Sequence, residues 1–172
     1  MGSTHIDSEG HMTTSANLSQ RFGTVLLASL IAVASAPAFA LDSVSYTRKG
    51  AAYEDVRLDL EGAIIAEVLT IDYRGNIGEM LKRTGADVGS NQPIYQQAEF
   101  MTFCSAKLSR AMMEADPANM SQCPYVVFIY QRAATTQEVV VGYRKVNAEG
   151  RAKKTLDEIN KLLERIVQAA SK

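Results

Sequence analysis

One segment near the N-terminus decides how much of this 172-residue chain is available to build a fold. The segment begins at Met12, carries one positive charge at Arg21, and continues into an apolar run over residues 25–33. It ends in Ala38-Phe39-Ala40, which places small residues at the −3 and −1 positions of a cleavage site. This order of features is typical of a secretory signal peptide. We therefore predict that residues 12–40 are a signal peptide that is cleaved after Ala40.

The protein that remains is predicted to be periplasmic or secreted. Residues 1–11 resemble an artificial tag, so the predicted mature chain covers residues 41–172 and contains 132 residues. This length suits one domain with a core that needs no metal or disulfide to support it. The apolar run is shorter than the roughly 20 residues that span a bilayer, so no stable membrane span is expected after cleavage.

The mature chain is expected to avoid nucleic acid and to lack the common catalytic groups. It contains 17 basic and 17 acidic residues, so it has no excess of the Lys and Arg that bind phosphates. Both histidines, His5 and His11, lie in the tag. Their position excludes Ser-His-Asp and Cys-His catalysis, histidine-ligated zinc and the c-type haem motif from the mature chain. The balance favours a protein that binds rather than an enzyme.

Hydrophobic periodicity predicts an alternation of strands and helices. Strands are predicted at 44–49, 68–73, 99–103, 125–130 and 138–144, and helices near 53–64, 77–81, 105–115 and 155–170. Ser105 is expected to cap the third helix and Asp116-Pro117 to end it. Thr155 and Glu158 have the spacing of a capping box for the last helix. The stretch Gly75-Asn-Ile-Gly78 lacks the spacing of a phosphate-binding loop.

This order of elements predicts an α+β fold, a two-layer sandwich of about five strands with amphipathic helices packed on the sheet. One face of such a sheet stays open and is the default surface for a ligand or a second copy of the chain. Tyr125, Tyr130 and Tyr143 lie on or beside the predicted hairpin, and we expect them in the core or in a dimer interface. The expected partners are a small molecule or a periplasmic protein, and self-association would give a homodimer.

Three stretches of the sequence resemble the family called domain of unknown function 302. They are Tyr46-Thr-Arg-Lys with the helix that runs into Val68-Leu-Thr-Ile, then Glu99-Phe-Met-Thr-Phe-Cys104, and finally Cys123-Pro-Tyr-Val-Val-Phe-Ile-Tyr130. The resemblance covers most of Ser45 to Arg144. It implies a small α+β domain that often self-associates, with a link in some members to bacterial oxidation of sulfur compounds, and it carries over no catalytic residues. Val68 departs from the family pattern, in which a glycine is expected between the helix and the strand.

Cys104 and Cys123 are the only cysteines, and an even pair in an exported protein favours a disulfide. The bridge would close a loop of roughly 20 residues and add about 3 kcal/mol of stability. A geometric argument opposes it. If the third and fourth strands are parallel neighbours joined by the helix, the two cysteines lie at opposite ends of the sheet, and Cα atoms more than about 7 Å apart cannot be bridged. Both alternatives stay open at this point.

Cys104 alone has a second interpretation, because it directly precedes the helix that Ser105 is expected to cap. A helix N-terminus lowers the pKa of a thiol and makes the thiolate reactive. Such a thiol suits a redox or sulfur-carrier protein. The competing interpretation is a small buried residue at the end of a strand, since cysteine is among the most buried residue types.

Each cysteine also follows a methionine by three residues, in Met101-x-x-Cys104 and Met120-x-x-Cys123. Thiolate and thioether sulfur are soft ligands that suit Cu(I). A strand places residues three apart on opposite faces, so Met101 and Cys104 meet only if Cys104 has already turned into the helix. Copper binding is therefore a further alternative, and gap-filling in the core is the competing role of the methionines.

The paired carboxylates are expected to lie on solvated helix faces. Asp55 and Asp59 are four residues apart, and Asp157 and Glu158 lie in a first helical turn, where acids complement the helix dipole. The leading hypothesis is therefore a periplasmic, non-enzymatic binding domain of unknown ligand. The alternatives are a thiol-based redox or sulfur-carrier protein and a Cu(I)-binding protein.

Overall fold

The computed structural model describes residues 42–135 and 137–172, which form a five-stranded antiparallel sheet with helices. The strands are β1 (Ser43–Lys49), β2 (Tyr73–Asn76), β3 (Tyr95–Phe103), β4 (Tyr125–Arg132) and β5 (Glu138–Arg144). The helices are α1 (Tyr53–Ala66), α2 (Ile77–Thr84), α3 (Ala106–Ala115) and α4 (Lys153–Ala170), with short turns η1 (Ala86–Val88), η2 (Pro117–Gln122) and η3 (Gly150–Ala152). The predicted α+β sandwich is confirmed. The predicted tag and signal peptide lie outside the described residues.

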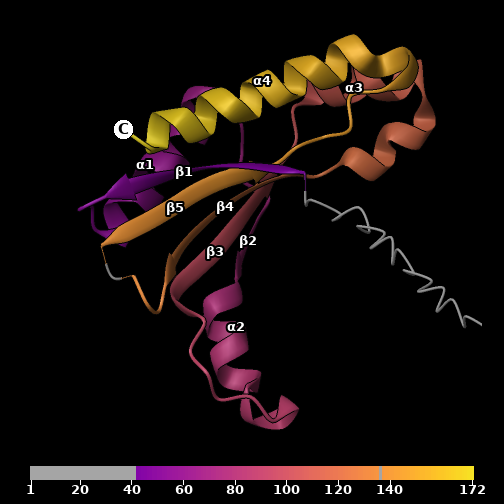
Figure 1. Ribbon diagram of the computed structural model, residues 1–172. Coiled ribbons are helices and arrows are strands. Elements are labelled where there is room, and N and C mark those ends of the chain that lie inside the picture. Colours follow the sequence, from indigo (N-terminus) through magenta and orange to yellow (C-terminus); the bar gives the residue numbers. More distant parts are fainter. Residues whose placement is uncertain (1–41, 136) are drawn as a thin grey trace, which may run out of the picture. The chain divides into compact units, whose positions relative to one another are not determined.

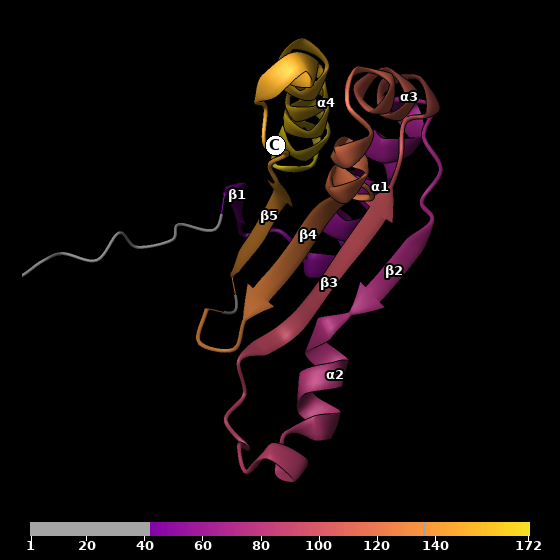
Figure 2. The ribbon, with the colours of Figure 1, turned by 90° about the vertical axis from the view of Figure 1, so that its right-hand side faces the viewer.

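The helices cover only one face of the sheet, whose strand order is β1-β5-β4-β3-β2. Helices α1, α3 and α4 lie on that face, and α2 extends from the end of β2 (Figures 1 and 2). Alternate residues of β4, such as Val127 and Ile129, point into the helical layer and are buried. The intervening residues belong to the opposite face, which α1, α3 and α4 leave uncovered and which α2 contacts only beside β3. The sheet therefore has one covered face and one open face.

Helix α4 supplies much of the core because its apolar residues recur every three or four positions. As the sequence pattern predicts, four of these residues are at most 1 % exposed: Leu156, Ile159, Leu163 and Ile166. The predicted capping box is wrong. The helix begins at Lys153, after the η3 turn, and its N-cap Ala152 makes no side-chain capping bond. Ser105 does cap α3, because its hydroxyl accepts a hydrogen bond from the Leu108 N–H.

The second strand lies later in the chain than predicted. Residues 68–73 were expected to pair, but β2 covers only Tyr73–Asn76. Leu69 and Ile71 instead pack against the core from an irregular segment. Val68 has a φ of 59°, in the left-handed region that favours glycine. The turn therefore has the backbone geometry expected for a glycine, to which the Val68 side chain is poorly suited.

Strands β3 and β4 are antiparallel, which corrects the parallel arrangement on which the argument against a disulfide depended. Phe103 at the end of β3 faces Tyr125 at the start of β4. The connection therefore leaves and re-enters the sheet at the same end. It does so because α3 is followed by η2, and the two together run out and back.

No helix of the described part of the chain is both long and apolar enough to cross a membrane.

Candidate functional site

The open face of the sheet carries a layer of aromatic side chains. Phe100 on β3 and Phe128 on β4 are direct cross-strand neighbours, and Tyr130 lies two residues further along β4. The Phe128 and Tyr130 rings are stacked with centroids 6.2 Å apart, and Tyr95 packs on Tyr130 at 5.4 Å. Because α1, α3 and α4 lie on the other face of the sheet, these partly exposed rings present an apolar surface to solvent. We call this the aromatic face.

Two glycines allow the phenylalanine rings to lie flat across neighbouring strands. Gly75 pairs with Phe100, and Gly142 pairs with Phe128. A Cβ atom on Gly142 would lie 2.5 Å from both the Phe128 ring and the Val44 carbonyl oxygen, and a Cβ on Gly75 would collide with the Phe100 ring. A side chain at either position would therefore lift the ring that now covers the strand. Because of the two glycines, the phenylalanine rings lie close to the sheet and the aromatic face is broad.

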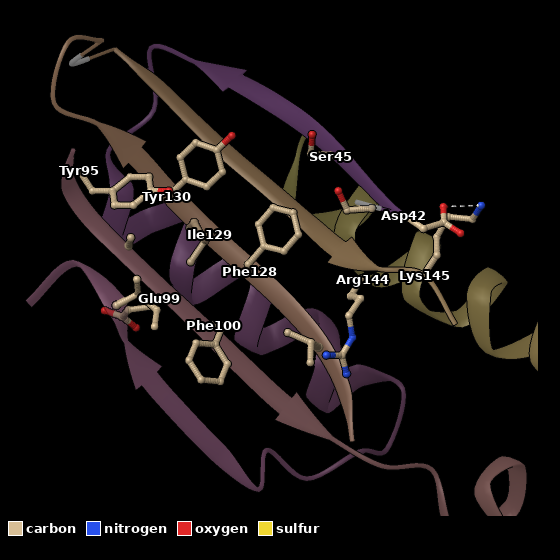
Figure 3. Close-up of a pocket in the computed structure, with 14 residues that line it drawn as sticks. Asp42, Ser45, Tyr95, Glu99, Phe100, Phe128, Ile129, Tyr130, Arg144 and Lys145 are labelled. Carbon is tan, nitrogen blue, oxygen red and sulfur yellow. Dashed lines mark ion pairs between the residues drawn. The ribbon is translucent and has the colours of Figure 1, made fainter. Parts of the chain in front are cut away.

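The aromatic face is hollowed into a concavity of about 660 Å³. Its floor is apolar, and Figure 3 shows Phe100 on β3 beside Phe128 and Tyr130 on β4. Ile77 from α2 and Ser45 from β1 complete the lining. Small-molecule sites are typically concave, about 300–1,000 Å³ in volume, and lined mostly by apolar and aromatic groups. The concavity has the size and the chemistry of such a site.

Three charged residues that line the concavity lie at one end, Asp42, Arg144 and Lys145, and Glu99 lies at the other end (Figure 3). Lys145 forms an ion pair with Asp42, with 2.9 Å between Nζ and Oδ1. The Arg144 guanidinium donates a hydrogen bond to the Pro124 carbonyl at 3.1 Å, and no carboxylate pairs with it among the described residues. Figure 3 shows Arg144 at the same end as Asp42 and Lys145. One arginine is thus available beside the rings for an acidic group.

The two cysteines lie close together at the end of β3 and β4. Cys104 follows the Phe103–Tyr125 pair, and Cys123 precedes it on the other strand, across a cis bond to Pro124. Both thiols are partly buried and free. Ser109 lies 3.4 Å from the Cys123 sulfur and 3.0 Å from the Tyr125 hydroxyl. The structure brings the sequence-predicted pair together.

A family model described as domain of unknown function DUF302 matches residues 44–171. The chain belongs to this family. The DUF302 match extends beyond the stretch that the sequence resemblance covered and includes α4. A search of curated proteins gives no match.

A solved DUF302 structure has the same fold. It is the crystal structure of an uncharacterized conserved protein DUF302 from Bacillus stearothermophilus, with a TM-score of 0.61 and 12% sequence identity. The alignment covers 76% of this chain and 99% of that chain. At this identity the likeness supports the fold alone.

The expected activation of Cys104 in this DUF302 domain is not found. Burial raises the pKa of the Cys104 thiol to about 11, and the contact with Cys123 raises it further. A hydrogen bond with the Tyr125 backbone lowers the pKa of Cys104, but neither this bond nor the position before α3 outweighs the two effects that raise it. The prediction of a lowered pKa is therefore wrong, because the thiol is buried beside a second thiol.

The two methionines of the predicted Cu(I) site lie in different environments. Met101 is fully buried in the core under the helices, whereas Met120 on η2 is 70% exposed. Among the described residues, no group of three or more His, Cys, Asp or Glu is placed to hold a metal. The Cu(I) site through Met101, Cys104, Met120 and Cys123 stays a prediction.

The remaining predicted residues divide between the core and the surface. Tyr125 and Tyr143 are buried under the helices, while Tyr130 belongs to the aromatic face. The carboxylates Asp55 and Asp59 are exposed, and Asp59 pairs with Arg48. The sequence analysis did not single out Phe100, Phe128 or Arg144. The sequence signal that could have identified these residues is the alternation of side chains between the two faces of β3, β4 and β5. This alternation places them on the face opposite the buried valines.

A polar cluster under α4 was also not predicted. Glu164 accepts hydrogen bonds from the hydroxyls of Tyr46 and Tyr143 and from the Gln168 amide. Burial works to raise the pKa of Glu164, but the three hydrogen bonds outweigh it and hold the pKa below its ordinary value of 4.5. The carboxylate therefore fastens α4 to β1 and β5 while it is ionised.

We expect this carboxylate to make stability depend on acid. A folded-state pKa below the unfolded value gives stability that is present above pH 4.5 and is lost as pH falls through the folded pKa. Glu164→Gln should therefore lower the urea midpoint more at about pH 7 than at about pH 3. Glu158→Gln, an exposed change on the same helix, is the matched control and should show no such pH dependence. Equal losses for Glu164→Gln at both pH values would contradict the assignment.

Proposed function

We propose that this protein is an exported, non-enzymatic binding domain whose aromatic face holds a flat, largely apolar small molecule with an acidic group. The concavity over Phe100, Phe128 and Tyr130 is the observation that carries the proposal. Aromatic side chains bind flat apolar ligands through large contact areas and offset stacking. The Arg144 guanidinium beside them favours a carboxylate or sulfonate, with which arginine forms two parallel hydrogen bonds.

Two features favour a small ligand over a second copy of the chain. The face is hollowed rather than flat, and its volume falls in the range of small-molecule sites. Its positive charge is confined to one end, where Arg144 and Lys145 lie, which suits a ligand with one acidic group. The residues that line the centre are apolar or aromatic, which fits binding better than acid–base chemistry. Export follows from the predicted signal peptide, and the intact mass of the exported chain tests it by reporting whether cleavage falls after Ala40.

The proposal is tested with two dyes of similar shape and different charge. Anilinonaphthalene sulfonate is aromatic and anionic, whereas N-phenylnaphthylamine is aromatic and neutral, and both fluoresce when bound. Phe128→Ala should weaken both dyes by about tenfold because each loses ring contacts. Arg144→Gln should weaken only the sulfonate, also by about tenfold, because the variant removes one charge-assisted hydrogen-bonding site. The Kd values are measured by fluorescence titration of the folded protein.

Lys161→Gln is the matched control, since it removes one positive charge from an exposed site on α4. It should leave both Kd values within about twofold. Light scattering on the same samples reports the oligomeric state. If the chain is a dimer that excludes both dyes, and Phe128→Ala dissociates it, the aromatic face belongs to a second copy and the small-molecule proposal is overturned. Equal weakening of both dyes by Arg144→Gln would overturn the acidic part of the proposal.

A further inference from the structure

The antiparallel pairing of β3 and β4 places two cysteines beside each other outside the aromatic face. The last residue pair of the ladder is Phe103 with Tyr125, and Cys104 and Cys123 lie one and two residues beyond it. Directly facing Cα atoms in antiparallel strands are about 4.5–5.5 Å apart. Disulfides accept Cα separations of about 4.4–6.8 Å, so an offset of one residue at the strand ends remains in range.

The two cysteines share their surroundings, because the Tyr125 backbone lies against Cys104 and the Ser109 hydroxyl contacts both Cys123 and Tyr125. Both thiols are free and partly buried at the same end of the sheet. Ser109 on α3 contacts the Cys123 sulfur and so holds it on the side of the helix. To form a bond the two sulfurs must approach to about 2.05 Å, a movement that rotation of the two side chains can supply between residues paired this closely. Partial exposure also leaves the pair open to a small disulfide oxidant.

We propose that Cys104 and Cys123 form a stabilising disulfide that ties the α3–η2 segment, Ala106–Gln122, to the sheet. In the presence of a disulfide oxidant such as oxidised glutathione, one cysteine thiolate attacks the oxidant and releases one glutathione as its thiol. The thiolate of the second cysteine then displaces the bound glutathione, and the protein sulfurs are joined. The protein loses two electrons and two protons, and the oxidant is reduced to two thiols.

The chemistry of the pair favours a lasting bond over a catalytic one. Oxidising catalysts contain cysteines of low pKa, whose stabilised thiolates make the disulfide easy to reduce. The pKa of Cys104 is raised to about 11, chiefly by burial, so its thiolate is a poor leaving group. A disulfide here should resist reduction. This distinguishes the proposed bridge from a redox or sulfur-carrier role for Cys104.

The test equilibrates the full chain with oxidised glutathione near pH 8, then acid-quenches it, alkylates it under denaturing conditions and weighs it. We expect no alkylation and a loss of two hydrogen masses, both reversed by prior reduction. The melting temperature should be higher in the oxidised protein by on the order of 10 °C, because the bridge closes a loop of about 20 residues. The double variant Cys104→Ser with Cys123→Ser should melt at the same temperature under both conditions.

Two results would overturn the proposal. One is a protein that still takes two alkyl groups, or keeps a glutathione adduct, after full oxidation. The other is a bridge between two chains, visible as a doubled mass without reductant. The mass measurement uses the unaltered protein, so it decides the question even if the serine variants fold poorly. It is also independent of dye binding to the aromatic face, so either proposal can fail without the other.

Discussion

Gly142→Ala is expected to destabilise the protein by about 2–3 kcal/mol, although it adds only one methyl group. The new Cβ would lie 2.5 Å from the Phe128 ring and 2.5 Å from the Val44 carbonyl oxygen. The ring can rotate away, but the carbonyl belongs to the β1 backbone that pairs with β5. Strand β5 lies between β1 and β4, so a displacement there disturbs two ladders. Urea unfolding monitored by circular dichroism measures the loss.

The matched control is the same chemical change at Gly62 on α1. A Cβ at Gly62 meets no atom within 4 Å, and alanine is the better helix former. Gly62→Ala should therefore stabilise the protein by about 0.5–1 kcal/mol. Adding Phe128→Ala to Gly142→Ala should restore only part of the loss, because the clash with the backbone carbonyl remains. Full recovery would show that the ring alone sets the cost.

Leu163→Ala is expected to cost about 2–5 kcal/mol and to leave the shape of the aromatic face unchanged. Leu163 is fully buried on α4, so its truncation leaves a cavity between the helix and the sheet. Phe128→Ala removes a larger side chain from the open face but should cost less than Leu163→Ala, because the ring is only partly buried. Urea unfolding and dye titration of both variants measure stability and binding separately.

This pair of variants separates the two faces of one sheet. In the folded protein, Leu163→Ala should bind both dyes with Kd values close to those of the wild type. Phe128→Ala should weaken both dyes while most of the stability is retained. If Phe128→Ala costs as much stability as Leu163→Ala, the ring is part of the core and the aromatic face is a structural surface.

The helical layer was predictable because its signal is local. Leu156, Ile159 and Leu163 recur at the helical period, and burial of that stripe follows directly from the sequence. The start of α4 was not predictable in the same way. Thr155 and Glu158 have the spacing of a capping box, but the η3 turn already provides an entry to the helix two residues earlier.

The errors in the strands have a different origin, since pairing depends on distant residues. The β-branched run at 68–73 has strand propensity but no partner until Tyr73 reaches Thr102. The direction of β4 relative to β3 depended on η2, which a local interpretation treats as part of a loop. The same correction changed the candidate site, because it moved Cys123 from the far end of the sheet to the side of Cys104.

The aromatic face was predicted as a surface but not as a set of residues. An open sheet face follows from the number of helices, whereas the concavity depends on the register that places Phe100 opposite Gly75 and Phe128 opposite Gly142. Register is a relation between strands, and no single stretch of sequence contains it. The charge of Arg144 became meaningful only when β5 was placed beside β4.

The pairing of the first strand with the last has a consequence for the order of synthesis. Among the described strands, β1 has β5 as its only neighbour, and their closest residues along the chain, Lys49 and Glu138, are 89 residues apart. A chain emerging from the ribosome therefore holds β1 without a partner until most of the domain has been made. Such late closure slows folding.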